Sequence, residues 1–246
     1  MTAAFTLARN EPFFLPLWSA YYGGQFGAEN LFVLDHESDD GSTRDLPCEV
    51  VPVNNGGECY AHEWMCRTVS TFQAILLARG FEAVVYSDVD EFLCHPDGLR
   101  RFVDRRLEQH ARATGYRLVQ DPPEAAYTQA RPILAQRGTW RRDRLYDKTL
   151  VSRESLTWLP GFHFLADRSD EAPAEGLTLV HLHCFDREQA RARHEARRDW
   201  RWQAGEQEQE RGLQWTLEGE ALEAWLDEQA AGAEPVAGWL REQVPF

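Results

Sequence analysis

The segment Phe81–Leu93 constrains the fold of this chain more than any other part of the sequence. Its apolar run Val84–Tyr86 predicts a short buried strand, and three carboxylates, Asp88, Asp90 and Glu91, follow within five residues. In extended backbone, side chains two residues apart point the same way. Two carboxylates on one face repel each other unless a cation or a proton lies between them. The pattern therefore predicts a site for a hard divalent metal ion, which prefers oxygen ligands.

An acidic turn that closes a strand is the alternative interpretation of this D-x-D sequence. Aspartate is common in turns after strands, because its side chain bonds to nearby backbone. The motif alone does not decide between the two interpretations, so the surrounding sequence has to.

Composition limits both the architecture and the partners. A chain of 246 residues with 43% hydrophobic residues can build one large α/β domain or two small ones. Its formal net charge of −14 argues against nucleic acid and anionic membrane as electrostatic partners. The segments 137–144 and 187–201 are rich in arginine, and an anionic ligand could use them. We expect most of these arginines to lie on solvated faces.

The cysteines and the apolar runs predict the setting of the protein. Five cysteines form no recognisable disulfide framework, and no apolar run has membrane-spanning length. The first residues lack a signal-peptide pattern, so we expect a cytoplasmic protein. A zinc site made of Cys59, His62 and Cys66, with Cys48 upstream, is an alternative whose spacing fits no common zinc signature.

The first 90 residues predict alternating strands and helices. We expect strands at 5–11, 30–34, 50–53 and 84–86, and helices at 12–22 and 61–78, the first of which ends at Gly23 and Gly24. This β-α-β-β-α-β order implies a largely parallel sheet with helices on its faces. Ligands bind beyond the carboxyl ends of such strands, where Asp35 and Asp88 are expected to lie together.

The remainder is predicted in less detail. An amphipathic helix is expected from Leu99 to Ala111, a strand at 116–120 and an irregular stretch up to about residue 144. A strand pair at 146–151 and 156–158 follows. A strand at 177–183 carries His181 and His183 on one face, and from residue 186 onward the chain is expected to be helical and highly charged.

Six short motifs resemble, in their order, the glycosyltransferase family 2-like group, in particular its subgroup with R-N-E and D-V-D-E-F sequences. They are N-E-P-F-F-L-P-L-W-x-A-Y-Y at 10–22, L-D-H-E-S-D-D-G-S at 34–42, Y-S-D-V-D-E-F at 86–92, K-T-L-V-S-R at 148–153, G-F-H at 161–163 and H-L-H-C-F at 181–185. The resemblance covers about residues 5–195. It implies a GT-A fold, with a Rossmann-like nucleotide-sugar domain at 1–195 and a helical C-terminal extension at 196–246 packed on it.

The resemblance also implies roles for individual residues. Asp88 and Asp90 match the ligands of a Mn²⁺ or Mg²⁺ ion that bridges the donor diphosphate, and His183 or His181 matches the histidine that completes the metal shell. Asp35 matches the acidic residue at the nucleoside. The residues that match the rest of the nucleoside pocket are Arg9, Asn10 and Glu11.

The implied activity is metal-dependent, hexosyltransferase-like transfer of a sugar from a nucleotide sugar, with a UDP-sugar favoured. The expected acceptor is a carbohydrate or a lipid-linked glycan. The metal acts as a Lewis acid on the leaving diphosphate. Lys148, the only lysine of the chain, lies at a motif position where it can add to that effect, although a solvent-exposed strand lysine is the alternative.

The base that deprotonates the acceptor is less well defined, since the acidic pair usual in the family has no clean counterpart. Asp147 is the first candidate by its region and Glu91 the second. His163, which follows Gly161 in a turn, can approach a ligand or be a packed loop residue.

Two other functions compete with glycosyl transfer. A nucleotidyltransferase also pairs aspartates around a metal, but it would normally carry a glycine-rich phosphate loop near its N-terminus. Here the early Gly23–Gly24 pair is expected after a helix and not after a strand. A non-catalytic nucleotide-sugar-binding module is the second competitor, and the intact D-x-D argues mildly against it.

Overall fold

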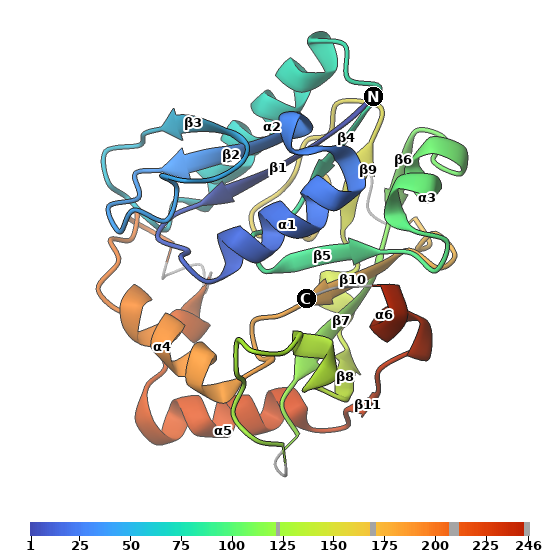
Figure 1. The fold of residues 1–246 in the computed structure, drawn as a ribbon. Coiled ribbons are helices and arrows are strands. Elements are labelled where there is room, and N and C mark those ends of the chain that lie inside the picture. Colours follow the sequence, from blue (N-terminus) through green and yellow to red (C-terminus); the bar gives the residue numbers. More distant parts are fainter. Residues whose placement is uncertain (122–123, 168–170, 207–211, 244–246) are drawn as a thin grey trace.

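Two mixed sheets organise the α/β fold of this chain (Figure 1). The computed structural model describes residues 1–121, 124–167, 171–206 and 212–243. In the six-stranded sheet, β1 (Thr2–Ala8), β2 (Leu31–His36), β3 (Glu49–Val53) and β4 (Ala83–Tyr86) pair in parallel in the order β3-β2-β1-β4. Two antiparallel strands, β9 (Thr149–Ser152) and β6 (His110–Arg112), extend it beyond β4.

The second sheet has five strands in the order β11-β8-β7-β10-β5. They are β5 (Glu91–Cys94), β7 (Thr114–Val119), β8 (Thr139–Arg142), β10 (Thr178–His181) and β11 (Glu234–Pro235). Only β10 and β7 pair in parallel, and the other pairs are antiparallel. Because β5 starts directly after Asp90, the D-x-D segment lies where the chain passes from one sheet to the other.

Six helices complete the described part of the chain. They are α1 (Phe14–Phe26), α2 (His62–Ala78), α3 (Leu99–Arg105), α4 (Arg187–Arg197), α5 (Gly219–Ala230) and α6 (Gly238–Gln243). Short 3-10 turns lie at Ala28–Asn30, Ile133–Ala135, Arg144–Tyr146 and Leu213–Thr216. Figure 1 shows α4 and α5 side by side, and an ion pair of 2.5 Å between Arg187 and Asp227 joins them.

The core forms around β1, which is buried at all seven residues. Phe5 packs against Phe72 of α2 and Tyr86 of β4, with ring centroids 5.3 Å and 5.1 Å apart. On α1, the Trp18 indole donates to Ser87 Oγ over 2.9 Å, directly after β4. Burial of large aromatic side chains of this kind is the main favourable term that fixes both helices on the sheet. It also fixes the segment that follows β4.

The predicted parallel strands and helix α2 are confirmed, but the expectation of one largely parallel sheet is incomplete. The second sheet pairs β5 with β10 and β7 with both β10 and β8, segments that are far apart in the sequence. Local periodicity shows that such segments are strands and does not show which partner each one takes. The structure therefore has two mixed sheets in place of one.

Two helix ends differ from the predicted ones. Helix α1 continues through Gly23 and Gly24 to Phe26, and Gly27, at φ 92°, ends it with an N–H bond of 2.8 Å to the Gly23 carbonyl. Each interior glycine costs only about 1 kcal/mol, which the buried aromatic residues of this helix outweigh. Helix α3 ends at Arg105, and Ala111 instead pairs with Val151 in the six-stranded sheet.

The C-terminal segment shares the main core with the strands. Val236 and Leu240 are buried in the same hydrophobic cluster as β1 and β4. A division at residue 195 would fall inside α4, and the two-part organisation into 1–195 and 196–246 stays a prediction. Within the described ranges, every helix is too short or too polar to cross a bilayer.

Candidate functional site

The carboxyl ends of β1, β2 and β4 meet at one edge of the six-stranded sheet. The register pairs Ala8 with Asp35 and Phe5 with Tyr86, so the polar residues that follow each strand emerge together. Asp35 and the Asp88 segment share this edge, as the sequence predicted. In open parallel sheets such an edge is where ligands bind.

The backbone between Asp88 and Glu91 forms a turn, and the expectation that Asp88 and Asp90 lie in extended backbone is wrong. The Glu91 N–H donates to the Asp88 carbonyl over 2.9 Å, which closes the turn and starts β5. The two carboxylates consequently have different neighbours. A turn is favoured here because the chain must change from one sheet to the other between β4 and β5.

Asp88 belongs to a cluster around the single lysine. The Lys148 ammonium lies 3.1 Å from Asp88 Oδ2 and 2.6 Å from Glu91 Oε1, and the Tyr86 hydroxyl donates to Asp88 Oδ1 over 2.7 Å. Burial alone would lower the pKa of Lys148, but Glu91 and Asp88 raise it above its usual value. Lys148 is buried, so the alternative of a solvent-exposed strand lysine is excluded.

Glu91 is the most deeply buried acid of this cluster, with 1% of its surface exposed. Burial raises its pKa to about 8, although Lys148 acts in the opposite direction. Its Oε2 has no hydrogen-bond partner in the part of the chain that the structure describes. A carboxyl group in this position holds the lysine in place and is closed off from an incoming acceptor.

Asp90 forms the second cluster with two histidines. Ligand atoms of Asp90, His181 and His183 all lie within 4.8 Å of one another, and the three residues are buried. The Asp90 Oδ2 atom lies 3.2 Å from His181 Nε2. Burial lowers the pKa of both histidines, so their rings are neutral and each keeps a lone pair for a metal ion. This buried group could hold a metal ion, and Asp88 does not belong to it.

Two arginines of α4 reach the same edge. Arg193 pairs with Asp90 Oδ2 through NH1 and with Glu11 Oε1 through NH2, the latter over 2.7 Å. Arg197 contacts Glu11 as well. Burial would raise the pKa of Asp90, but Arg193 and His181 hold it well below its usual range. A carboxylate that stays ionised although it is 4% exposed is ready to bind a cation.

Asp35 forms the polar turn that was the alternative to a nucleoside contact. Its Oδ1 accepts from the Ser38 N–H over 2.9 Å, and its Oδ2 accepts from the Thr43 hydroxyl over 3.2 Å. Asp35 is half-buried, and these contacts use only one lone pair on each oxygen. The turn is therefore present, and a role of Asp35 at the nucleoside stays a prediction.

Arg9, Asn10 and Glu11 follow β1 at this edge, as expected. Arg9 NH1 donates to the His36 carbonyl over 3.0 Å, and Asn10 exchanges two hydrogen bonds with Asp39, of 2.8 Å and 3.0 Å. Asn10 has φ 52°, a left-handed conformation that asparagine adopts more readily than most residues. These contacts hold the ends of β1 and β2 together. None of them tests the predicted nucleoside pocket.

The two candidates for the base, Asp147 and Glu91, and the third predicted catalytic residue, His163, differ in how accessible they are. Asp147 accepts from the Gly115 N–H over 2.8 Å and from Arg142 NH2 over 2.6 Å, so each of its oxygens already has a partner. Gly115 permits this contact, because a Cβ atom there would overlap the Tyr146 backbone. Asp147 thus holds in place the backbone that leads into Lys148. Because both of its oxygens are already hydrogen-bonded, it is poorly suited to proton transfer.

His163 is half-buried at the rim of the Lys148 cluster. Its Nδ1 lies 2.6 Å from the Leu145 carbonyl, which places the proton on Nδ1 and leaves the Nε2 lone pair available. Burial and the charge of Lys148 lower the pKa of His163 to about 4. Gly161, at φ 86°, is required beside it, since a Cβ atom there would lie 2.8 Å from the His163 ring.

Several residues of the site were not singled out from the sequence. Arg193 and Arg197 lie in the arginine-rich segment 187–201, for which solvated faces were expected. Arg193 has only 11% of its side chain exposed and stacks over Phe14, and Arg197 lies 4.1 Å from the centroid of the Trp215 ring. The alternation of arginine with small residues in α4 indicates that one face of the helix is buried. It does not indicate which arginine lies on that face.

The other arginine-rich segment and the cysteines also differ from expectation. Arg137 is 1% exposed and pairs with Asp186 over 2.6 Å, so it is not on a solvated face. The proposed zinc ligands Cys48, Cys59, His62 and Cys66 do not form a metal-binding group among the described residues. All five cysteines are free of disulfides.

Comparisons with known proteins assign no family to this chain. No protein-family model matches the sequence, and no curated protein does. The solved structures with some similarity include a protein named as a glucose-1-phosphate thymidylyltransferase from Bacillus anthracis, in complex with sucrose (TM-score 0.33, 9% identity, 75% of this chain and 73% of that chain). TarS 1–349 from S. aureus has a TM-score of 0.36 and 11% identity over 92% of this chain and 78% of that chain.

A mannose-1-phosphate geranyltransferase from Thermus thermophilus has a TM-score of 0.33 and 12% identity over 63% of this chain and 50% of that chain. These similarities are distant. At such scores and identities they give this chain neither a family nor an activity.

Proposed function

We propose that this chain is a metal-dependent glycosyltransferase that moves a sugar from a nucleotide sugar, with a UDP-sugar favoured, to a carbohydrate or lipid-linked glycan acceptor. The observation that carries the proposal is the position of the Asp90–His181–His183 group. Its Asp90 follows β4, at the edge where the parallel strands β1, β2 and β4 end, and its histidines come from the end of β10, where His181 pairs with Glu91 of β5. This edge is the ligand-binding edge of such sheets.

The residues present suit a divalent metal ion such as Mn²⁺. Asp90 supplies an ionised carboxylate, and His181 and His183 supply neutral imidazoles. The Nδ1 atom of His181 is buried and has no hydrogen-bond partner in the described ranges, so this ring is held by its Asp90 contact and by packing. A metal ion bound there would supply Lewis-acid stabilisation of the leaving diphosphate.

The basic residues around the group give it the charge that a diphosphate needs. Lys148 pairs with Asp88 of the D-x-D turn and Arg193 pairs with Asp90, while Arg197 pairs with Glu11, which Arg193 also contacts. In this structure the carboxylates of Asp88, Asp90 and Glu11 neutralise these cations. A donor diphosphate would bind by taking over some of those contacts, which are charge-assisted and well suited to phosphate oxygens.

For the proton of the acceptor hydroxyl, His163 is the best placed of the three candidate residues. It is half-buried and has an available Nε2, whereas Glu91 is closed off and Asp147 has partners on both oxygens. His163 is neutral at neutral pH, and the negative charge of a bound donor would raise its pKa toward the useful range.

A thermal-shift screen of UDP-, GDP-, CMP- and dTDP-sugars, with Mn²⁺ or Mg²⁺ and with neither, tests this function. A ligand that binds only the folded state raises the melting temperature by mass action. We expect one class of nucleotide sugar to stabilise the chain only when the metal is present. If no nucleotide sugar stabilises the chain under any metal condition, the proposal fails.

A further inference from the structure

A fourth buried residue, His194, contacts His183 of the Asp90–His181–His183 group. His194 of α4 is 2% exposed, and its Nε2 lies 3.1 Å from the Nε2 of His183. Trp215 stacks on the His183 ring at a centroid distance of 4.6 Å and an angle of 9°. Trp225 lies against both imidazoles, at 5.4 Å from His183 and 5.6 Å from His194. The two rings are therefore fixed by packing as well as by their mutual contact.

The chemistry of a metal-bound imidazole determines which histidine of this pair donates the hydrogen bond and which accepts it. When one ring nitrogen of a histidine binds a metal, the other carries a proton and requires a hydrogen-bond acceptor. The Nε2 of His183 faces His194, and the Nε2 lone pair of a neutral His194 is the acceptor at hydrogen-bond distance. The Nδ1 of His183 would then be the nitrogen available to a metal ion.

We propose that His194 is a positioning residue that holds His183 in the orientation and tautomer needed to bind a divalent metal. The inference deepens the proposed function and rests on the metal site within it. Outer-shell partners of this kind raise the basicity of a ligating histidine and restrict its rotation. Removing one typically costs about 10- to 100-fold in metal affinity, by the order of magnitude found for such partners.

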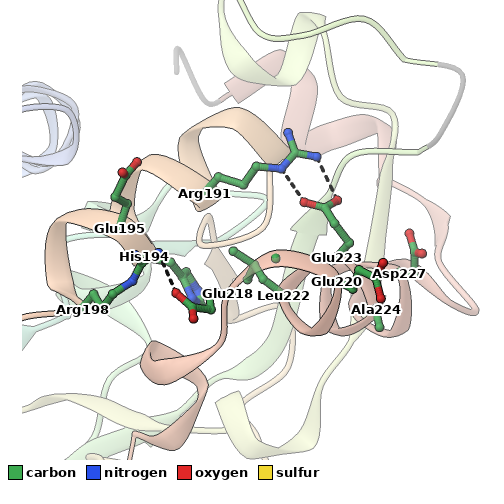
Figure 2. A pocket seen from close by; sticks show the side chains of 11 residues that line it. Arg191, His194, Glu195, Arg198, Glu218, Glu220, Leu222, Glu223, Ala224 and Asp227 are labelled. Carbon is green, nitrogen blue, oxygen red and sulfur yellow. Dashed lines mark hydrogen bonds and ion pairs between the residues drawn. The ribbon is translucent and has the colours of Figure 1, made fainter.

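A pocket beside His194 allows the proposal to be tested by chemical rescue. A pocket of about 650 Å³ is lined by residues of α4 and α5, among them His194. Figure 2 shows the side chains that line it. Ion pairs between Arg191 and Glu223 and between Arg198 and Glu218 lie along it. A free imidazole molecule is small enough to enter a cavity of this size and occupy the space that a shorter side chain leaves.

The experiment measures Mn²⁺ affinity of the full chain by calorimetry for the wild type, His194→Ala and His194→Gln. We expect His194→Ala to lose about 10- to 100-fold in affinity. His194→Gln should retain most of it, because the glutamine amide oxygen can accept the His183 proton. His95→Ala is the matched control, since His95 is equally buried but follows β5 at the end away from Asp90. Its Mn²⁺ affinity should equal that of the wild type.

Added imidazole separates positioning from packing. It should restore Mn²⁺ binding to His194→Ala, with the wild type in the same imidazole concentration as a correction for free imidazole–metal binding. Melting temperatures without metal show whether each variant is folded. If His194→Ala does not fold, the glutamine variant decides. Unchanged affinity in the alanine variant, or an equal loss in the alanine and glutamine variants without imidazole rescue, would overturn the proposal.

The outcome is distinguishable from failure of the proposed function. If the wild type binds no divalent metal, both the positioning role and the metal dependence fail. If Mn²⁺ affinity depends on His194 but no nucleotide sugar is bound or converted, the positioning role stands and the glycosyltransferase function fails.

Discussion

At the scale of single residues, the two aspartates of the D-x-D sequence have different partners. Asp90 lies against His181 and Arg193, whereas Asp88 lies against Lys148 and Tyr86. The turn between β4 and β5 separates them, so that the acid pair does not act as one unit in this structure. The sequence predicted that both residues follow β4 at the edge of the sheet, and their role in a site stays a prediction. It could not assign their partners, because these come from segments far along the chain.

Replacing each aspartate separately should distinguish their roles. Asp90→Asn removes the only carboxylate of the histidine group, and we expect about a hundredfold or greater loss of Mn²⁺ affinity. Asp88→Asn, as the matched control, should change Mn²⁺ affinity several-fold less, since its first partner is Lys148. Calorimetric titration of both variants with Mn²⁺ measures this. Equal losses in the two variants would show that both aspartates bind the metal directly.

Asp35 permits a test that separates a turn from a ligand contact. Asp35→Ala removes the carboxylate and both of its turn bonds, whereas Thr43→Val removes only the bond to Asp35 Oδ2. If Asp35 contacts the nucleoside, Asp35→Ala should weaken nucleoside-diphosphate binding about tenfold, the effect of about 1.4 kcal/mol, and Thr43→Val should not. Equal affinity of Asp35→Ala and the wild type for UDP would leave the turn as the only role.

At the scale of elements, the sequence predicted what depends on local periodicity. The buried runs of β1, β2 and β4 and the long helix α2 were identifiable from apolar spacing, and so was the edge they share. The second sheet was not, since the pairing of β5 with β10 depends on contacts between distant segments. Helix α4 was expected, but its buried arginine was not, because the hydrocarbon part of an arginine can lie on an apolar surface.

Arg193 is one of three residues of helix α4 that contact the candidate site, together with His194 and Arg197. Arg193→Ala leaves Asp90 and part of Glu11 without their buried cation, and we expect a loss of about 3 kcal/mol or more in unfolding free energy. Arg197→Ala should cost less, because Arg193 still pairs with Glu11. Urea unfolding of the two variants compares them. A larger loss for Arg197→Ala would contradict this order.

The Arg193→Ala variant also tests whether Arg193 and a metal ion compete for Asp90. Without Arg193, Mn²⁺ meets less positive charge at Asp90, so metal affinity should rise. Binding of a nucleoside diphosphate should fall, if Arg193 contacts the phosphates as proposed. A fall in both affinities would indicate that α4 merely supports the site.

At the scale of the whole molecule, stability should depend on pH through buried neutral histidines. Burial lowers the pKa of His194 to about 4, whereas in the unfolded chain this histidine is protonated below about 6.5. Between these values the unfolded chain binds the extra proton, so stability falls as the pH falls. Relative to His194→Gln, the wild type should lose at most about 1.4 kcal/mol per pH unit in this window.

Urea unfolding of the two proteins between about pH 7.5 and about pH 5 measures this difference. Glu91 acts in the opposite direction, because burial raises its pKa to about 8 and its contribution to stability is lost as the pH rises. Both proteins contain Glu91, so the comparison cancels it. A difference in unfolding free energy that is constant with pH would show that His194 has the same pKa in the folded and the unfolded chain, and would contradict this prediction.

The whole-molecule charge of −14 makes the candidate site an exception on an acidic protein. Lys148, Arg193 and Arg197 gather at the one edge where the parallel strands end, each paired with a carboxylate. An anionic ligand would be attracted to these cations and repelled by the net negative charge of the rest of the chain. Net charge was readable from the sequence, but the gathering of these three side chains required the fold.

The products formed from nucleotide sugars distinguish glycosyl transfer from the competing nucleotidyl transfer. A metal-dependent glycosyltransferase breaks the bond between the sugar and the diphosphate and forms a bond between the sugar and an acceptor hydroxyl. Incubation with Mn²⁺, an active donor and an acceptor carbohydrate, or water in its place, should therefore release a nucleoside diphosphate, with no need for pyrophosphate. The release should fall about a hundredfold or more in Asp90→Asn. Formation of a nucleoside triphosphate and a sugar phosphate only when pyrophosphate is added would instead show a nucleotidyltransferase, and would contradict glycosyl transfer.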